Sequence, residues 1–275
     1  MVIAQYHTCV HDRRVRQVAS VLFALAVIVA PTPMLSQSVI ELRQYTLHPG
    51  QRDVLIELFE REFIEGQEAM GMAILGQFRD LDRPDRFVWI RAFADMPSRA
   101  TSLQAFYGGS VWQRNRAAAN ATMVDSDNVL LLRPARAGSG FALTGRSRPP
   151  RGTTISSSAV VVATLYSFDA PVEGRFVEFF EGHIRPRFEE AGGRLLAYFV
   201  TEPAANNFPR LPVREGEHVF VWFASFASEA EYAAHVARRD ASNGWRGMTE
   251  ELAGWLKEPP EVLRLRPTPR SLIGN

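Results

Sequence analysis

The segment Phe87–Ala94, with the sequence FVWIRAFA, recurs later in the same chain as FVWFASFA at Phe220–Ala227. Further upstream, Tyr45 recurs as Tyr166. The interval between copies is longer for the first pair of segments than for the two tyrosines. One insertion in the second copy explains the difference, and it falls in 201–217, where Pro and Asn are frequent as in long loops. The chain is therefore predicted to contain two copies of one structural unit.

Each unit is predicted to have the order strand, helix, strand, strand, helix, strand. Alternating or β-branched runs predict the strands, and apolar residues at helical spacing predict the helices. The βαββαβ order is that of the ferredoxin-like fold in the α+β class. Its helices cover one face of the sheet, so we expect the two uncovered faces to meet and enclose a barrel-like cavity. In the first unit the predicted strands are 40–47, 72–79, 87–93 and 129–133, and the second predicted helix, 98–123, is interrupted at 108–109.

The predicted segments divide the chain into five parts. Residues 39–135 are expected to form the first domain and residues 159–267 the second. Between them, 136–158 is rich in Gly, Ser, Arg and Pro, which is typical of a linker. Residues 268–275 are expected to form a tail, and residues 1–38 an N-terminal hydrophobic segment.

This N-terminal segment resembles a secretory signal peptide. Arg13, Arg14 and Arg16 precede an apolar run at 18–30, which is too short for a comfortable membrane span. We therefore predict a secreted or periplasmic protein, with no membrane insertion after cleavage. Two alternatives are an uncleaved membrane anchor and translation that begins at Met34, which would leave the protein in the cytoplasm.

Composition excludes several classes of function. The chain has 275 residues and a formal net charge of +1, which gives no electrostatic basis for binding nucleic acid. Its one cysteine, Cys9, lies in the predicted signal peptide, so a cysteine nucleophile or Cys-ligated zinc is not expected downstream. No two of the later histidines have metal-ligand spacing, and for His235 a surface or capping role is expected. We therefore predict no metal and no cofactor; the oligomeric state stays open.

Strand alternation predicts a candidate ligand site in the first unit. Glu41, Arg43 and Tyr45 share one face of their strand, because successive side chains point to opposite faces. If the aliphatic faces pack on the helices, the polar faces line the barrel. Three arginines among aromatic rings suit a planar anion, through bidentate hydrogen bonds and stacking. The alternative is that the arginines pair with nearby carboxylates such as Glu41, Asp80 or Asp85. The predicted ligand-binding residues are Arg43, Tyr45, Gln77, Arg79, Trp89 and Arg91.

The second unit places neutral residues at the matching positions. We therefore expect the charged end of a ligand to face the first unit, and its apolar part to face the second. The matching residues are Thr164, Tyr198, Val200, Trp222 and Ala224.

Several stretches of the first unit resemble the NIPSNAP family. They are 41–50 (ELRQYTLHPG), 77–81 with 85–89, 105–109 with 111–112, and 119–127. The resemblance implies a dimeric α+β barrel fold, here formed by two tandem units within one chain. That superfamily includes haem-degrading and quinone-forming monooxygenases. The NIPSNAP family has no settled catalytic activity, so the resemblance supplies no catalytic residues.

Three functions remain open from the sequence. The first is binding of a small hydrophobic or aromatic anion in the barrel. The second is a cofactor-light monooxygenase or isomerase that acts on an aromatic substrate. The third is an interaction protein whose barrel is a filled core.

Overall fold

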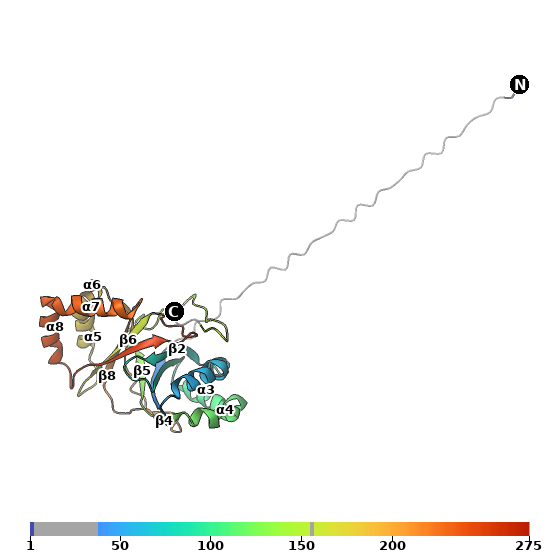
Figure 1. Ribbon diagram of the computed structural model, residues 1–275, viewed down its shortest axis with the longest axis horizontal. Coiled ribbons are helices and arrows are strands. Elements are labelled where there is room, and N and C mark those ends of the chain that lie inside the picture. The colour runs from blue at the N-terminus through green and yellow to red at the C-terminus, as the bar shows by residue number, and fades with distance from the viewer. Residues whose placement is uncertain (3–37, 155–156, 275) are drawn as a thin grey trace. The chain divides into compact units, whose positions relative to one another are not determined.

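The computed structural model describes residues 1–2, 38–154 and 157–274. Contacts divide the chain into residues 1–33 and residues 34–275, and every helix and strand named below lies in the second unit (Figure 1). The predicted signal peptide, residues 1–38, lies almost entirely outside the described residues. None of the described helices combines the length and the apolar character that a membrane span requires.

The two sequence repeats fold into two copies of the predicted unit. Each has a π-helical segment within its first helical region, and these segments begin at Phe59 and at Phe180, which are equivalent positions of the repeat. The first repeat contains β1 (Val39–Leu47), α1 (Arg52–Leu58), η1 (Phe59–Phe63), α2 (Ile64–Glu68), β2 (Ala73–Asp80), β3 (Arg86–Phe93), α3 (Met96–Gly108), α4 (Ser110–Asn120), β4 (Met123–Asp125) and β5 (Val129–Pro134). The second repeat contains β6 (Val160–Ser167), α5 (Gly174–Phe179), η2 (Phe180–Ile184), α6 (Arg185–Glu190), β7 (Arg194–Thr201), β8 (Val219–Phe226), α7 (Glu229–Ala241), α8 (Asn243–Ala253) and β9 (Glu261–Pro267).

Eight of these strands close into an antiparallel barrel. Their order is β3-β2-β9-β6-β8-β7-β5-β1, and the pairing of β1 with β3 completes the ring. The repeats join at two seams, β2 with β9 and β5 with β7. The short strand β4 pairs with the end of β1 beside the ring. The predicted α+β barrel of two tandem ferredoxin-like units is thereby confirmed.

Aliphatic and aromatic side chains fill the barrel interior. One cluster of buried residues draws on alternate positions of all eight barrel strands, and side chains alone can fill a barrel of eight strands. The predicted hollow between the sheet faces is therefore wrong. Phe141, from the segment predicted as a linker, and Ile273, from the predicted tail, also join this cluster. Other members include Leu42, Phe78, Val88, Ile90, Leu132, Ala163, Phe199, Val221, Phe223 and Leu265.

The helices cover the outer face of the barrel and form two further cores, one for each repeat. In the first repeat, residues from α1, η1 and α3 pack against Tyr45, Ile74, Phe87 and Trp89. In the second, α5, η2 and α8 pack against the corresponding strands. Figure 1 shows α3 and α4 on one side of the barrel and α5 to α8 on the opposite side. Any cavity within a repeat must therefore lie between its helices and its strands.

Candidate functional site

Strand alternation grouped the predicted site residues correctly but placed them on the wrong side of the sheet. Arg43, Trp89 and Arg91 face the helices, whereas Leu42 and Val88 between them fill the barrel. The physical reason is that aliphatic side chains can fill a closed interior without polar partners. The guanidinium groups of Arg43 and Arg91 need such partners, and Glu41 on the same sheet face and Gln67 of α2 supply them.

Four charged residues form a buried cluster on the helix-facing side, which we call the Glu41 cluster: Glu41, Arg43, Arg91 and Arg99. All four are fully buried. One carboxylate oxygen of Glu41 accepts hydrogen bonds from Arg43 and Arg91, and the other accepts one from Arg99, each at 2.7 Å. The sequence left open the alternative that the strand arginines pair with carboxylates such as Glu41. Arg43 and Arg91 do so in the structure.

Three guanidinium groups around one carboxylate leave an excess of positive charge in the protein interior. Burial alone would raise the pKa of Glu41, but the guanidinium groups of Arg91, Arg43 and Arg99 outweigh burial and hold the pKa far below its usual range. Glu41 is therefore ionised, and two positive charges remain. The buried Nη2 atoms of Arg43 and Arg99 have no hydrogen-bond partner among the described residues.

Amide side chains complete the surroundings of the cluster. Gln67 of α2 accepts a hydrogen bond from Arg91 at 2.9 Å. Asn206 and Asn207 accept hydrogen bonds from Arg99 at 3.0 and 2.7 Å. These two asparagines belong to the insertion that the second repeat carries between β7 and β8. The insertion therefore reaches across to the site of the first repeat, which the sequence did not indicate.

Tyr45 connects the Glu41 cluster to a cavity. Arg43 Nε donates a hydrogen bond to the Tyr45 hydroxyl oxygen at 2.9 Å, so the hydroxyl proton remains available for another acceptor. Burial raises the pKa of Tyr45 even though the Arg43 charge opposes the shift, and the side chain therefore stays a neutral phenol. Such a phenol can donate a hydrogen bond to a negatively charged group in the cavity.

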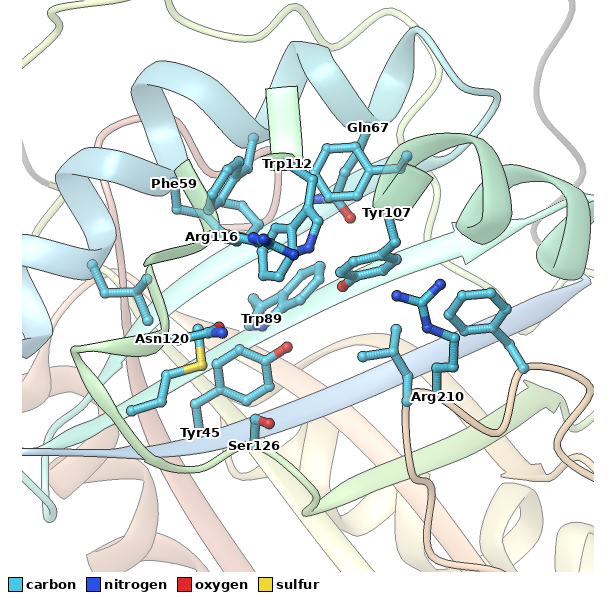
Figure 2. Close-up of a pocket in the computed structure, with 16 residues that line it drawn as sticks. Tyr45, Phe59, Gln67, Trp89, Tyr107, Trp112, Arg116, Asn120, Ser126 and Arg210 are labelled. Carbon is cyan, nitrogen blue, oxygen red and sulfur yellow. The ribbon is translucent and has the colours of Figure 1, made fainter. Parts of the chain in front are cut away.

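This cavity, the first-repeat pocket, has a volume of about 330 Å³ and lies between the sheet and the helices of the first repeat (Figure 2). Eight of its sixteen lining residues are aromatic. Trp89 is packed edge-to-face against Tyr45 and Phe59, with ring centroids 5.8 and 4.8 Å apart. The pocket is lined by Tyr45, Leu55, Phe59, Phe63, Gln67, Trp89, Phe106, Tyr107, Trp112, Arg116, Asn120, Met123, Ser126, Phe208, Arg210 and Leu211.

Two arginines are the charged residues in the wall of the first-repeat pocket. Arg116 of α4 and Arg210 of the insertion are both exposed, and Figure 2 shows them from opposite sides of the cavity. Neither has a hydrogen-bond or ion-pair partner in the part of the chain that the structure describes. No Asp or Glu side chain of the described residues lines the pocket. The electrostatic potential in the cavity is therefore positive, from these arginines and from the Glu41 cluster behind its wall.

The insertion supplies one side of this pocket. Phe208 stacks on Tyr107 with ring centroids 6.0 Å apart, and Asn207 donates a hydrogen bond to the backbone oxygen of Met96 at 2.6 Å. Leu211 and Arg210 follow in the same wall. The first-repeat pocket is thus built from both copies of the sequence repeat.

Four of the six predicted site residues come together at or behind the pocket. Tyr45 and Trp89 line it, and Arg43 and Arg91 lie in the Glu41 cluster. The other two do not take part, because Arg79 pairs with Asp53 at 2.8 Å and Gln77 is fully buried away from the pocket wall. Sequence reasoning missed Arg99, Arg116 and Arg210. Their places depend on how helices and a loop pack on the sheet, which alternation in a strand cannot indicate.

The second repeat has a related cavity without the charge cluster. This second-repeat pocket, of about 300 Å³, includes Thr164, Tyr166 and Trp222 at the positions of Arg43, Tyr45 and Trp89. Of the predicted neutral lining, Tyr198, Val200 and Ala224 are buried on the same helix-facing side but are not part of the pocket wall. When the two repeats are aligned on their shared residues, the whole Glu41 cluster is replaced, by Val162, Thr164, Ala224 and Tyr232.

Comparison with known proteins supports the fold and gives a family match for the first repeat. Residues 40–137 match the NIPSNAP family. These residues form a NIPSNAP domain. No curated protein sequence matches the chain. A NIPSNAP family protein of unknown function from Agrobacterium tumefaciens is 23% identical, with 36% of this chain and 90% of that chain covered and a TM-score of 0.34.

Two solved structures resemble the chain over both repeats. One is described as a "putative monooxygenase" from Fusobacterium nucleatum, with 10% identity, a TM-score of 0.54, and 88% of this chain and 97% of that chain covered. The other is an anthrone oxidase-like protein, with 12% identity, a TM-score of 0.51, and 85% and 92% covered. At these identities the likeness shows a shared fold, in which the NIPSNAP domain forms the first half of the barrel.

Proposed function

We propose that the first-repeat pocket binds a small aromatic anion. The observation that carries the proposal is the pair of unpartnered arginines, Arg116 and Arg210, in the wall of an aromatic cavity that no described carboxylate lines. An anion between them would gain Coulomb energy from both arginines and from the net positive Glu41 cluster. The proposed ligand site thus lies between the sheet and the helices of the first repeat, not in the barrel.

The second repeat supports a functional role for the cluster. It builds the same strands and helices with uncharged side chains at all four cluster positions, so the fold itself does not need buried charge there. Placing three guanidinium groups out of water costs several kcal/mol for each ion unless they are well paired. A ligand anion in the adjacent pocket would offset part of that cost.

Pocket size limits the ligand to about two or three fused rings. A volume of about 330 Å³ is at the lower end of the range of roughly 300 to 1,000 Å³ for small-molecule sites. The rings of Trp89 and Trp112 would stack on a planar ligand, and the Tyr45 hydroxyl would donate a hydrogen bond to its anionic group. An aromatic carboxylate has both features.

Isothermal titration calorimetry with 2-naphthoate and its uncharged amide, 2-naphthamide, tests the proposal. We expect the carboxylate to bind at least tenfold more tightly, with an affinity that falls as salt screens the arginines. Arg116→Gln and Arg210→Gln should each weaken naphthoate binding about 1.5-fold to fivefold, since an ion pair with an exposed charge contributes roughly 0.2–1 kcal/mol. Arg114→Gln, an exposed position on the same helix outside the pocket wall, should leave the affinity unchanged. Equal affinity for the acid and the amide would overturn the proposal.

A second candidate function is oxidation of an aromatic substrate by dioxygen. The hydrogen bond from Arg43 to Tyr45 favours it, because a polarised phenol could stabilise an enolate formed in the pocket. In such a reaction a ring CH₂ group becomes a carbonyl, and the second oxygen atom of dioxygen leaves as water. Oxygen consumption with anthrone tests this candidate. Catalysis should fall at least tenfold in Tyr45→Phe, and no consumption above the buffer rate by the unmodified protein would rule it out.

A further inference from the structure

His235, on α7, is a buried polar residue in the wall of the second-repeat pocket. The sequence predicted a surface or capping role, but its side chain is 1% exposed. The surface role is wrong, because α7 packs this side of its surface against α6 and β8. The capping role agrees with the structure, since His235 Nδ1 lies 3.0 Å from the backbone oxygen of Ala191, the C-cap residue of α6. The rings of Phe188 and Phe226 lie against the imidazole, with centroids 4.7 and 4.9 Å away.

The hydrogen bond of His235 shows which ring nitrogen lacks a partner. Its Nδ1 atom lies 3.0 Å from the backbone oxygen of Ala191, and a carbonyl oxygen can only accept, so Nδ1 carries the proton. Burial lowers the pKa of His235, so the ring is neutral at pH 7. The Nε2 atom therefore presents a lone pair. It is buried and has no hydrogen-bond partner among the described residues.

The rest of this pocket combines aromatic, aliphatic and hydroxyl-bearing side chains and has no free charge. Arg239 is its charged wall residue, and that guanidinium is already bonded to Asp240 at 2.9 Å and lies over the Trp245 ring at 5.1 Å. No carboxylate of the described chain lines the cavity. In contrast to the first-repeat pocket, the second-repeat pocket has an imidazole nitrogen as its strongest hydrogen-bond acceptor, beside the hydroxyl groups of threonine and tyrosine side chains. A neutral planar ligand that carries a single donor fits this combination.

We propose that the second-repeat pocket binds a neutral hydroxyaromatic molecule, whose hydroxyl group donates a hydrogen bond to Nε2 of His235. The rings of Tyr166 and Trp222 would flank the ligand. The chain would thus carry two small-molecule sites of different chemistry, one in each repeat. This inference is independent of anion binding in the first repeat, because the two pockets share no wall residue.

Two ligands that differ only at the donor test the proposal. 2-Naphthol has the hydroxyl group, and in 2-methoxynaphthalene a methyl group replaces its proton. We expect calorimetry to show at least tenfold tighter binding of naphthol to the unmodified protein. In ¹⁵N-histidine spectra, the Nε2 resonance of His235 should shift on addition of naphthol and stay unchanged with the ether. Equal affinities, or a His235 resonance that naphthol does not move, would overturn the proposal.

A matched pair of variants assigns the effect to one nitrogen. His235→Asn keeps a side-chain N–H that can donate to Ala191 but removes the Nε2 acceptor, and it should reduce the preference for naphthol over the ether to less than threefold. His183→Asn makes the same change at an exposed histidine outside the pocket and should preserve the preference. A preference that survives in folded His235→Asn would contradict the proposal. If that variant does not fold, the spectra of the unmodified protein decide the question.

Discussion

Glu41 stabilises three guanidinium groups that have no access to water. Its two carboxylate oxygens accept hydrogen bonds at 2.7 Å from fully buried arginines. Removing one partner from such an arrangement leaves buried charges without compensation, which is far more costly than breaking a surface ion pair. The free energy of unfolding should therefore depend strongly on this single side chain.

We predict that Glu41→Gln lowers the free energy of unfolding by about 3–5 kcal/mol, because three buried guanidinium groups lose their counter-charge. Urea unfolding followed by tryptophan fluorescence would measure the change. Glu57→Gln, at an exposed carboxylate on α1, should shift the same quantity by no more than about 0.5 kcal/mol. A loss below about 1 kcal/mol in Glu41→Gln would show that the cluster is not held by this carboxylate.

The pH dependence of stability provides a second test of the same residue. Folding lowers the pKa of Glu41 from its ordinary value of 4.5, so the stabilisation is present above pH 4.5. It is lost as the pH falls towards the depressed value in the folded state, since the unfolded chain then binds a proton that the folded chain does not. The unmodified protein should thus lose more stability than Glu41→Gln between pH 5 and pH 3. Parallel stability curves for the two proteins would contradict the assignment.

At the scale of elements, the insertion between β7 and β8 is the part of the second repeat that contributes side chains to the site of the first repeat. It supplies Asn206 and Asn207 to the Glu41 cluster, and Phe208 and Arg210 to the pocket wall. The corresponding hairpin of the first repeat, between β2 and β3, lacks the insertion and is shorter for that reason. This difference in length accounts for the presence of a loop wall in one pocket and its absence in the other.

Truncating the aromatic side chain of this loop should open the first-repeat pocket. We predict that Phe208→Ala weakens 2-naphthoate binding about twofold to tenfold, because a ring contact contributes roughly 0.5–1.5 kcal/mol. Pro212→Ala, in the same loop but outside the pocket wall, should bind naphthoate as the unmodified protein does. Calorimetry compares the two variants. Equal affinities in both would mean that the loop does not contact the ligand.

Most elements and strand faces could be predicted, because strand alternation and the repeat are local properties of the sequence. Alternation placed Glu41, Arg43 and Tyr45 on one face, and the structure agrees. It could not say which face meets the helices, since both faces of these strands are buried. The role of Arg99 could not be predicted for another reason, because its contact with Glu41 joins a helix to a strand 58 residues away in the sequence.

At the scale of the whole molecule, the repeats share one structure but differ in charge. Both halves contribute to the packed barrel interior, so neither half can bury its inner sheet face without the other. The helix-facing layers are separate, and there the first repeat carries the Glu41 cluster while the second carries neutral side chains. The side chains of each pocket can therefore differ in charge and polarity without a change in the packing of the barrel interior.

Replacing the Glu41 cluster with the equivalent residues of the second repeat tests whether the cluster can change without disturbing the barrel. We predict that the variant Glu41→Val, Arg43→Thr, Arg91→Ala and Arg99→Tyr folds with a free energy of unfolding within about 2 kcal/mol of the original, because replacing a complete buried ion cluster by apolar residues is often neutral or stabilising. Its affinity for 2-naphthoate should fall at least tenfold, because the charge behind the pocket wall is gone. An unchanged affinity would mean that the cluster has no role in binding, and a variant that does not fold would mean that the first repeat needs it for structure.

Crystallography with a bromine-labelled aromatic acid would show where in the protein an aromatic anion binds. Crystals soaked in 6-bromo-2-naphthoate, with data collected at the bromine absorption edge, would locate the ligand by anomalous scattering. The account predicts a bromine peak inside the first-repeat pocket among Trp89, Trp112 and Phe63, with carboxylate density near Arg116 and Arg210. A peak in the second-repeat pocket alone, or no ordered bromine at a concentration that saturates binding in solution, would contradict it.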